Sequence, residues 1–294
     1  MNISISCILL GLGVKCLLNW ALVFLQRNHI CRSFMGVFSV SLAVVDTALT
    51  LVFAAIHIHS DGHFFLLGLE VTRYHTCLLV QIFGQVYGAL QWPVVVVAGL
   101  DHLCTISLQP AAFRAKWIVR SFVTVLLWNL AALYVFMLSD FIPVLEDVSH
   151  YQIRHCWVFH TTQILQVVTL LSLTLGYATL HANLSTRLVK NPPQEDQRGT
   201  HPRRSFVCQV LRILLNTWAL FLIFPAALLL LPVGIPSYLG LNVAWLCFLN
   251  SFLIAVVLCV VRPTSQLAHG LAAVPPDSFC EWRFKFSLAA EDST

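Results

Sequence analysis

Long stretches of uncharged, mostly apolar residues alternate with short polar segments along this chain. A helix needs about 20 such residues to cross the hydrocarbon core of a bilayer, and each stretch meets that length. Lipid offers the backbone no hydrogen-bond partners, and the stretches are longer than barrel strands, so they predict α-helices. The pattern predicts seven spans, at residues 5–26, 33–59, 74–107, 117–138, 157–184, 205–231 and 238–261.

The distribution of basic residues predicts the orientation of these spans. Cytoplasmic loops of membrane proteins are rich in Lys and Arg. With an extracellular N-terminus, only Arg73 and Arg154 among the basic loop residues fall outside. We therefore expect an all-α membrane protein, with a seven-transmembrane helix bundle over residues 1–261 and a cytoplasmic tail over 262–294.

Composition supports a multi-pass membrane protein and narrows its partners. Charged residues make up 10% of the chain and hydrophobic residues 58%, far from the balance of a water-soluble domain. The net charge of +4 comes from Lys and Arg beside the spans, where they face lipid headgroups. We expect membrane lipid as a partner and no nucleic acid.

Two of the ten cysteines differ from the others in location. Cys77 begins the third span and Cys156 precedes the fifth, both on the predicted outer, oxidising side, so we predict a disulfide between them. Seven of the others fit the role of small apolar packing residues: Cys7, Cys16, Cys31, Cys104, Cys208, Cys247 and Cys259. Cys280 lies in an aromatic and basic patch of the tail and is a candidate palmitate acceptor, with an unmodified tail as the open alternative.

Polar residues within the spans are costly in lipid and need a reason. Asp46 lies in the middle of the second span, so its side chain is expected to face inward, toward Asn19 and Asn250 with its neighbour Ser251. A structural hydrogen-bond network is the favoured interpretation, and a cation site is the alternative. Lys15 is close enough to the outer end of the first span for its ammonium group to reach outward, and we expect no role for it.

Several motifs together resemble the rhodopsin-like G-protein-coupled receptors over nearly the whole chain. They are Asn19, the Leu-Ala-Val-Val-Asp run at 42–46, the Cys77 and Cys156 pair, Trp128, and the distance from Cys77 to Asp101-His102-Leu103. Segments 33–35, 74–77, 154–156 and 250–255 are similar to an orphan member. The resemblance implies a plasma-membrane signal-transduction receptor that senses an extracellular ligand and acts on a heterotrimeric G protein. It also implies a set of switch and network residues: Asn19, Asp46, Asp101, His102, Trp218, Asn250 and Ser251.

Three activation motifs depart from the family pattern. His102 stands where the family has Arg, and histidine is shorter and lacks the bidentate fork of a guanidinium. Trp218 resembles the activation Trp of the sixth helix, but Leu220 replaces the proline beyond it. Ile254 and Ala255 stand at the seventh-helix Asn-Pro. A receptor with altered motifs and a non-coupling, partner-binding scaffold therefore both remain open.

The ligand and the reaction class are only coarsely constrained. The outer half of the third span offers no acid that would pair with an amine, which favours a lipid or peptide ligand. Histidines gather near the outer face, where proton or zinc sensing competes with the commoner solvated loop histidine. For a membrane hydrolase, Asp101, His102, His29 and His181 are scattered without metal-ligand spacing. We expect no enzyme activity, no metal and no cofactor.

Overall fold

The computed structural model describes two units of this chain, each a compact body. The first comprises Met1–Thr161 and Gly234–Cys247, and the second comprises Thr162–Val233 and Phe248–Thr294. The described residues are 2–25, 33–58, 63–66, 69–107, 113–138, 155–170, 172–173, 176, 211, 214–216, 218–223, 227 and 234–261.

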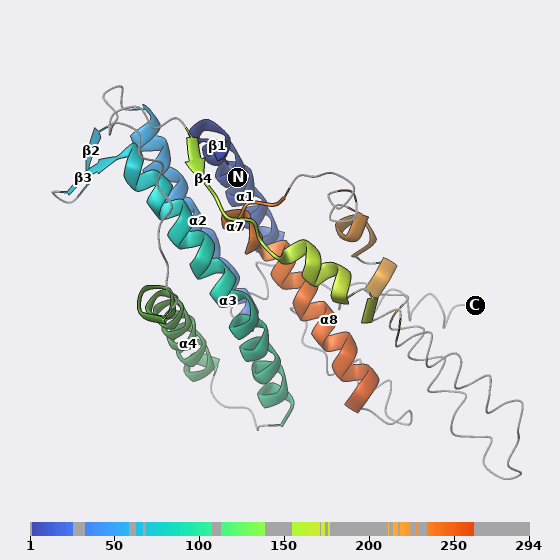
Figure 1. Ribbon diagram of the computed structural model, residues 1–294. Coiled ribbons are helices and arrows are strands. Elements are labelled where there is room, and N and C mark those ends of the chain that lie inside the picture. Colours follow the sequence, from blue (N-terminus) through green and yellow to red (C-terminus); the bar gives the residue numbers. More distant parts are fainter. Residues whose placement is uncertain are drawn as a thin grey trace, which may run out of the picture. The chain divides into compact units, whose positions relative to one another are not determined.

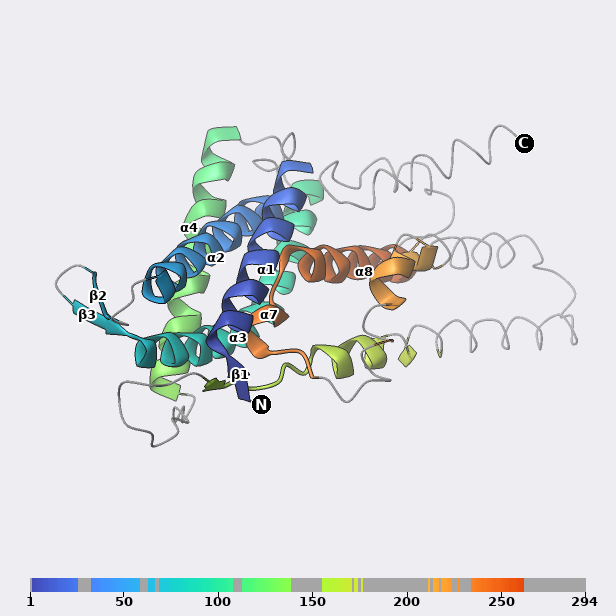
Figure 2. The same ribbon diagram turned by 90° about the horizontal axis from the view of Figure 1, so that it is seen from above.

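The first unit contains four long apolar helices (Figure 1). They are α1 (Ile5–Leu25), α2 (Phe34–Ile58), α3 (Arg73–Ser107) and α4 (Phe113–Leu133), the last extended by the π-helical turn η2 (Tyr134–Leu138). Within the described part of the chain, these four are long and apolar enough to cross a membrane. α2 contacts both α1 and α4, as Figure 2 shows. The first four predicted spans thus exist as helices, and the membrane-protein fold class is confirmed.

The last predicted span is interrupted near its beginning. A short helix, α7 (Ser237–Gly240), ends before Leu241, whose backbone is extended, and α8 (Val243–Val261) starts two residues later. Asn242 explains the restart, because its Oδ1 accepts the Trp245 N–H at 2.9 Å, the bond of an N-cap residue. The expectation of a continuous helix from residue 238 was therefore wrong at this end.

Predicted spans five and six are described only in part. Helical residues are described at 163–170 within span five and at 218–223 within span six. The count of seven spans stays a prediction. The tail over 262–294, including Cys280, lies outside the described residues.

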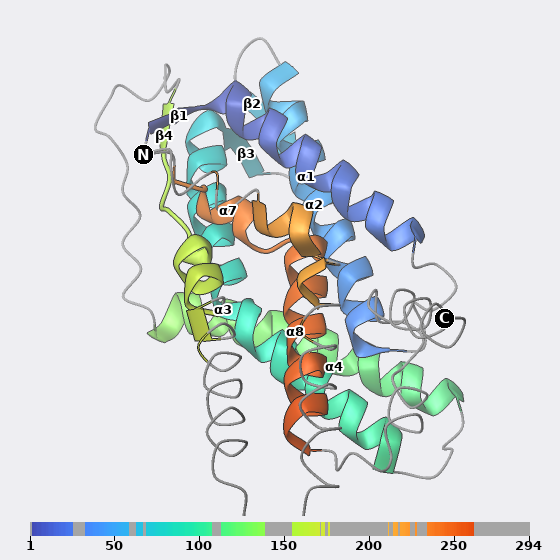
Figure 3. The same ribbon diagram turned by 90° about the vertical axis from the view of Figure 1, so that its right-hand side faces the viewer.

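Two pairs of short strands add to the helices and were not predicted. β1 (Asn2–Ser4) pairs antiparallel with β4 (His155–Trp157), and β2 (His63–Leu66) pairs antiparallel with β3 (Leu69–Thr72). The β1–β4 pair lies beside the N-terminus, as Figure 3 shows. It brings the first residues of the chain against the segment that carries Cys156.

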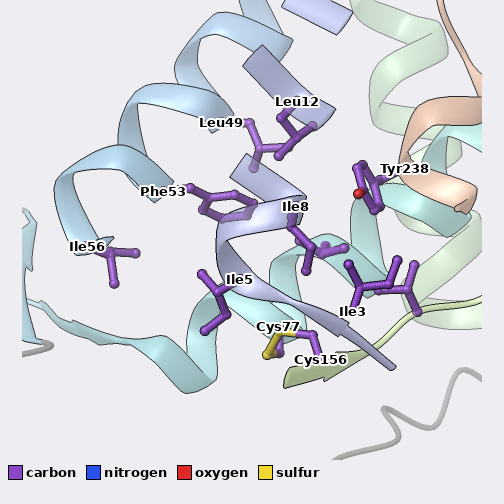
Figure 4. Close-up of a cluster of buried hydrophobic side chains, with 12 residues drawn as sticks. Ile3, Ile5, Ile8, Leu12, Leu49, Phe53, Ile56, Cys77, Cys156 and Tyr238 are labelled. Atoms are coloured by element: carbon purple, nitrogen blue, oxygen red, sulfur yellow. A yellow bond between two sulfur atoms is a disulfide. The ribbon is translucent and has the colours of Figure 1, made fainter. Parts of the chain in front are cut away.

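A cluster of buried apolar side chains fills the end of the first unit next to this strand pair (Figure 4). Side chains of α1 pack there against those of α2 and α3, and Tyr238 adds its ring from α7. α7 packs mainly on α3 and also touches α1. The cluster comprises Ile3, Ile5, Ile8, Leu12, Leu49, Phe53, Ile56, Cys77, Val80, Cys156, Val158 and Tyr238.

Candidate functional site

The carboxylate of Asp46 is the centre of a buried polar network in the first unit. Asp46 has no solvent-exposed surface. Its Oδ1 lies 2.8 Å from Lys15 Nζ and accepts the Tyr87 hydroxyl at 2.6 Å, and its Oδ2 accepts the Asn19 amide at 2.7 Å. These donors come from α1 and α3, so one carboxylate on α2 joins three helices.

Lys15 takes part in this network, contrary to the expectation that its ammonium group reaches outward. The residue is buried, and its Nζ also donates to the Tyr238 carbonyl oxygen at 3.0 Å. Nζ lies 4.0 Å from the centre of the Tyr87 ring, within range of a cation–π contact. The physical reason is the buried carboxylate, since an unpaired charge inside a membrane protein is costly and a paired one much less so.

The sequence held a signal for the Lys15 position. Lys15 precedes Asn19 by four residues, and residues four apart share a helix face. An inward-facing Asn19 therefore implies an inward-facing Lys15.

Asn19 connects Asp46 to the start of α8. While its amide nitrogen donates to Asp46, its Oδ1 accepts the N–H of Val243 at 3.0 Å. Val243 is the first residue of α8, and the first N–H groups of a helix have no partner within the helix. Asn19 thus satisfies one of these groups. Its side chain also links the Asp46 carboxylate directly to the first residue of α8.

A second polar cluster lies around Asp101, near the C-terminal end of α3. Its Oδ1 lies 3.1 Å from Arg120 Nε of α4, and its Oδ2 accepts the Phe34 N–H at 3.0 Å. Phe34 is the first residue of α2, where Ser33 caps the helix by accepting the Gly36 N–H. Asp101 therefore ties together α2, α3 and α4. The pairing of Arg120 with Asp101 was not predicted from the sequence.

His102 follows Asp101 in α3, and its side chain lies outside the described part of the structure. Trp218, Asn250 and Ser251 are buried residues of the second unit. The Trp218 ring meets the Phe248 ring edge-on, with ring centres 5.6 Å apart. The expected contact of Asn250 with Asp46 stays a prediction.

The predicted disulfide between Cys77 and Cys156 is present, with the two Cα atoms 5.3 Å apart. It joins the beginning of α3 to β4, where Cys156 pairs with Ile3 of β1. Gln81, one turn along α3, donates its amide to the Trp157 carbonyl at 2.9 Å. The disulfide, the strand pair and this bond fix β4 against the beginning of α3.

Metal-ligand side chains are dispersed in the part of the chain that the structure describes. No group of three or more His, Cys, Asp or Glu residues there could hold a metal ion. The Asp46 carboxylate pairs with Lys15, and the Asp101 carboxylate pairs with Arg120.

Curated relatives match the chain over nearly its full length. The protein named probable G-protein coupled receptor 160 from Mus musculus is 30% identical over 289 residues, which cover 92% of this chain and 84% of the relative. The chain belongs to this receptor family. The Homo sapiens protein of the same name is 28% identical over 303 residues, covering 97% of this chain and 87% of its own length. No family model matches the chain. No solved structure matches it.

Membership of the probable G-protein coupled receptor 160 family confirms the resemblance seen in the sequence. Together with the apolar helices, it makes the chain a multi-pass plasma-membrane protein of the G-protein-coupled receptor class. It also indicates a receptor rather than an enzyme.

Proposed function

We propose that this chain is a plasma-membrane receptor that senses an extracellular ligand and signals through rearrangement of its helices around Asp46. The observation that carries the proposal is the buried Asp46 network, which joins α1, α2, α3 and the α7–α8 junction. A shift of α1, α2 or α3 would break a hydrogen bond to a buried charge. Each buried group left without a partner costs roughly 1–3 kcal/mol. Such a network favours a small number of discrete arrangements over continuous deformation.

An extracellular N-terminus forms part of this proposal. Disulfides persist on the oxidising side of a membrane, and the pairing of β1 with β4 holds the N-terminus beside the Cys77–Cys156 bond. In this orientation α3 runs from an extracellular Cys77 to a cytoplasmic Asp101. Residues 1–261 then form the receptor domain and 262–294 the cytoplasmic tail, with Cys280 as its candidate lipidation site.

The chemistry near the extracellular end of α3 supports a lipid or peptide ligand over an amine. Residues 77–88 of α3 contain no acidic side chain that could pair with an ammonium group. Gln81, the first polar side chain after the disulfide, is buried and donates to a backbone carbonyl. A ligand recognised here would therefore be bound mainly through apolar and neutral polar contacts.

A second candidate is a receptor-like scaffold that binds partners without activating a G protein. His102 favours it, because the rhodopsin-like receptors have Arg at this position of the third helix and this chain does not. The Asp101 carboxylate instead pairs with Arg120 and the start of α2. Altered activation motifs are common to both candidates, and G-protein coupling separates them.

A G-protein dissociation panel in cells tests the two candidates. Cells would express the unmodified chain, the His102→Arg variant or a His102→Gln control at matched surface amounts, with mock cells as the baseline. Basal signal from the unmodified chain would support the receptor. Silence of all three at normal surface amounts would contradict coupling and favour the scaffold. Signal from His102→Arg alone would identify an intact bundle with a disabled third-helix switch.

A further inference from the structure

The atoms around Lys15 Nζ form a coordination shell suited to a small cation. The Asp46 Oδ1 and the Tyr238 carbonyl oxygen lie 2.8 and 3.0 Å from Nζ, and the Tyr87 ring covers another side at 4.0 Å. Carboxylate and carbonyl oxygens are ligands that hard cations prefer, and an aromatic face attracts positive charge. The shell comes from α2, α3 and α7, so it exists independently of the α1 residue that fills it.

Charge balance explains why a cation must occupy this shell. The Lys15 and Asp46 side chains are 2% and 0% exposed, so water cannot solvate either charge. The other donors to the carboxylate, Asn19 and Tyr87, are neutral. A buried carboxylate without a counter-charge is strongly disfavoured.

We propose that Lys15 is a tethered counter-ion that closes a monovalent-cation site formed by Asp46 and the Tyr238 carbonyl. The ammonium group is carried by α1 and needs no ion from solution, so the folded bundle is independent of sodium. Truncating Lys15 opens the site to Na⁺. This inference concerns binding and stability, and it holds whether or not the chain couples to a G protein.

The tether also links the cation position to the α7–α8 junction. Lys15 Nζ bonds the Tyr238 carbonyl of α7, and Asn19 on the same face of α1 bonds the N–H of Val243. A free ion at the shell would still bridge Asp46 and Tyr238, but it would no longer hold them to α1. Lys15 therefore connects three elements where an ion would connect two.

Thermal unfolding of the purified full-length chain in phosphatidylcholine nanodiscs tests the proposal through intrinsic tryptophan fluorescence. Each protein is measured in sodium chloride and in choline chloride at equal ionic strength, because choline is too large for the shell. The unmodified chain should have the same Tm in both salts. Lys15→Ala should unfold at lower temperature in choline and recover as sodium concentration rises, as expected for a ligand that binds the folded state. The double variant Lys15→Ala/Asp46→Asn should show no sodium-specific recovery.

Binding of radioactive sodium to the same nanodiscs provides a direct second readout. Retention by Lys15→Ala, and none by the unmodified chain or the double variant, would support the tethered counter-ion. If the Tm of Lys15→Ala is the same in sodium chloride and in choline chloride, the proposal is overturned. If Lys15→Ala does not fold, the unmodified chain still decides: sodium-specific stabilisation that Asp46→Asn removes overturns the proposal, and a flat response supports it.

Discussion

Gly84 of α3 lies directly against Ser237 of α7, and a Cβ atom at position 84 would overlap the Ser237 hydroxyl oxygen. Gly88, one turn further along α3, is exposed, and a Cβ atom there would meet no neighbouring atom within 4 Å. The close approach of α7 to α3 thus depends on the missing side chain at one glycine and not at the other. It is this approach that brings the Tyr238 carbonyl to Lys15.

Substituting Ala at these two glycines should affect stability differently. Gly84→Ala forces α7 away from α3 and should lower the free energy of unfolding by about 1–3 kcal/mol, as overpacking does. Gly88→Ala should be neutral or stabilising by up to about 1 kcal/mol, because Ala favours the helix. Thermal unfolding in nanodiscs measures both variants. Equal Tm shifts for the two would show that α7 does not rest on Gly84.

Loss of the disulfide should reduce folding and surface delivery. The Cys77–Cys156 bond closes a loop with a sequence separation of 79 residues. By loop-entropy reasoning it contributes around 4 kcal/mol. Cys77→Ser, Cys156→Ser and the double variant should all reach the cell surface in similarly reduced amounts, measured by labelling intact cells.

A matched thiol control comes from Cys7, which is free and exposed in the structure. Cys7→Ser should reach the surface like the unmodified chain. Normal surface delivery of Cys77→Ser would contradict a role of the disulfide in folding. A double variant much worse than either single variant would indicate that the two cysteines act separately.

The two Asn residues at the start of α8 should differ in their contribution. Asn242→Ala removes an N-cap bond to Trp245, at a cost of about 1 kcal/mol. Asn19→Ala removes the acceptor for the Val243 N–H and also a donor to the buried Asp46 carboxylate. It should therefore cost more, about 1.5–3 kcal/mol for the charged bond alone.

Hydrogen exchange of the first turn of α8 provides the readout for these variants. Both should speed exchange at Trp245, while Asn19→Ala should also speed it at Val243. Asn19→Asp is the informative control, since it keeps an oxygen for Val243 but brings a second carboxylate to Asp46. A stability of Asn19→Asp equal to that of the unmodified chain would argue against the Asn19–Asp46 contact.

The sequence predicted those features of this chain that depend on local signals. Span length fixed α1 to α4 because a bilayer demands a minimum apolar run, and the oxidising side singled out Cys77 and Cys156. Asp46 stood out because a carboxylate in mid-span is costly. The structure places Asn19 beside it.

Features that depend on distant partners were missed. Lys15 meets Asp46 from 31 residues away and Tyr238 from 223 residues away, and depth in the membrane alone favoured an outward direction. The break before α8 depends on Asn242 as a cap within an otherwise apolar run. The pairing of β1 with β4 joins residues far apart in sequence, and strands of three residues leave no periodic signal.

Arg120 should hold Asp101 away from any basic residue introduced at position 102. Arg120 is largely buried and its Nε bonds Asp101 Oδ1, whereas Oδ2 bonds the Phe34 N–H. Arg120→Gln removes the charge pair and leaves the bond to Phe34, so its cost should be modest, about 1 kcal/mol for a partly exposed carboxylate. Arg120→Lys is the matched control because it keeps the charge.

Combining these changes with His102→Arg tests whether Arg120 competes for Asp101. If it does, Arg120→Gln in the His102→Arg background frees the carboxylate for the introduced guanidinium and should change the basal G-protein signal relative to His102→Arg alone. Arg120→Lys should leave that signal nearly unchanged, because an ammonium group still neutralises Asp101. Identical signals from the Gln and Lys variants, at matched surface amounts, would mean that the charge at position 120 does not act on this end of α3.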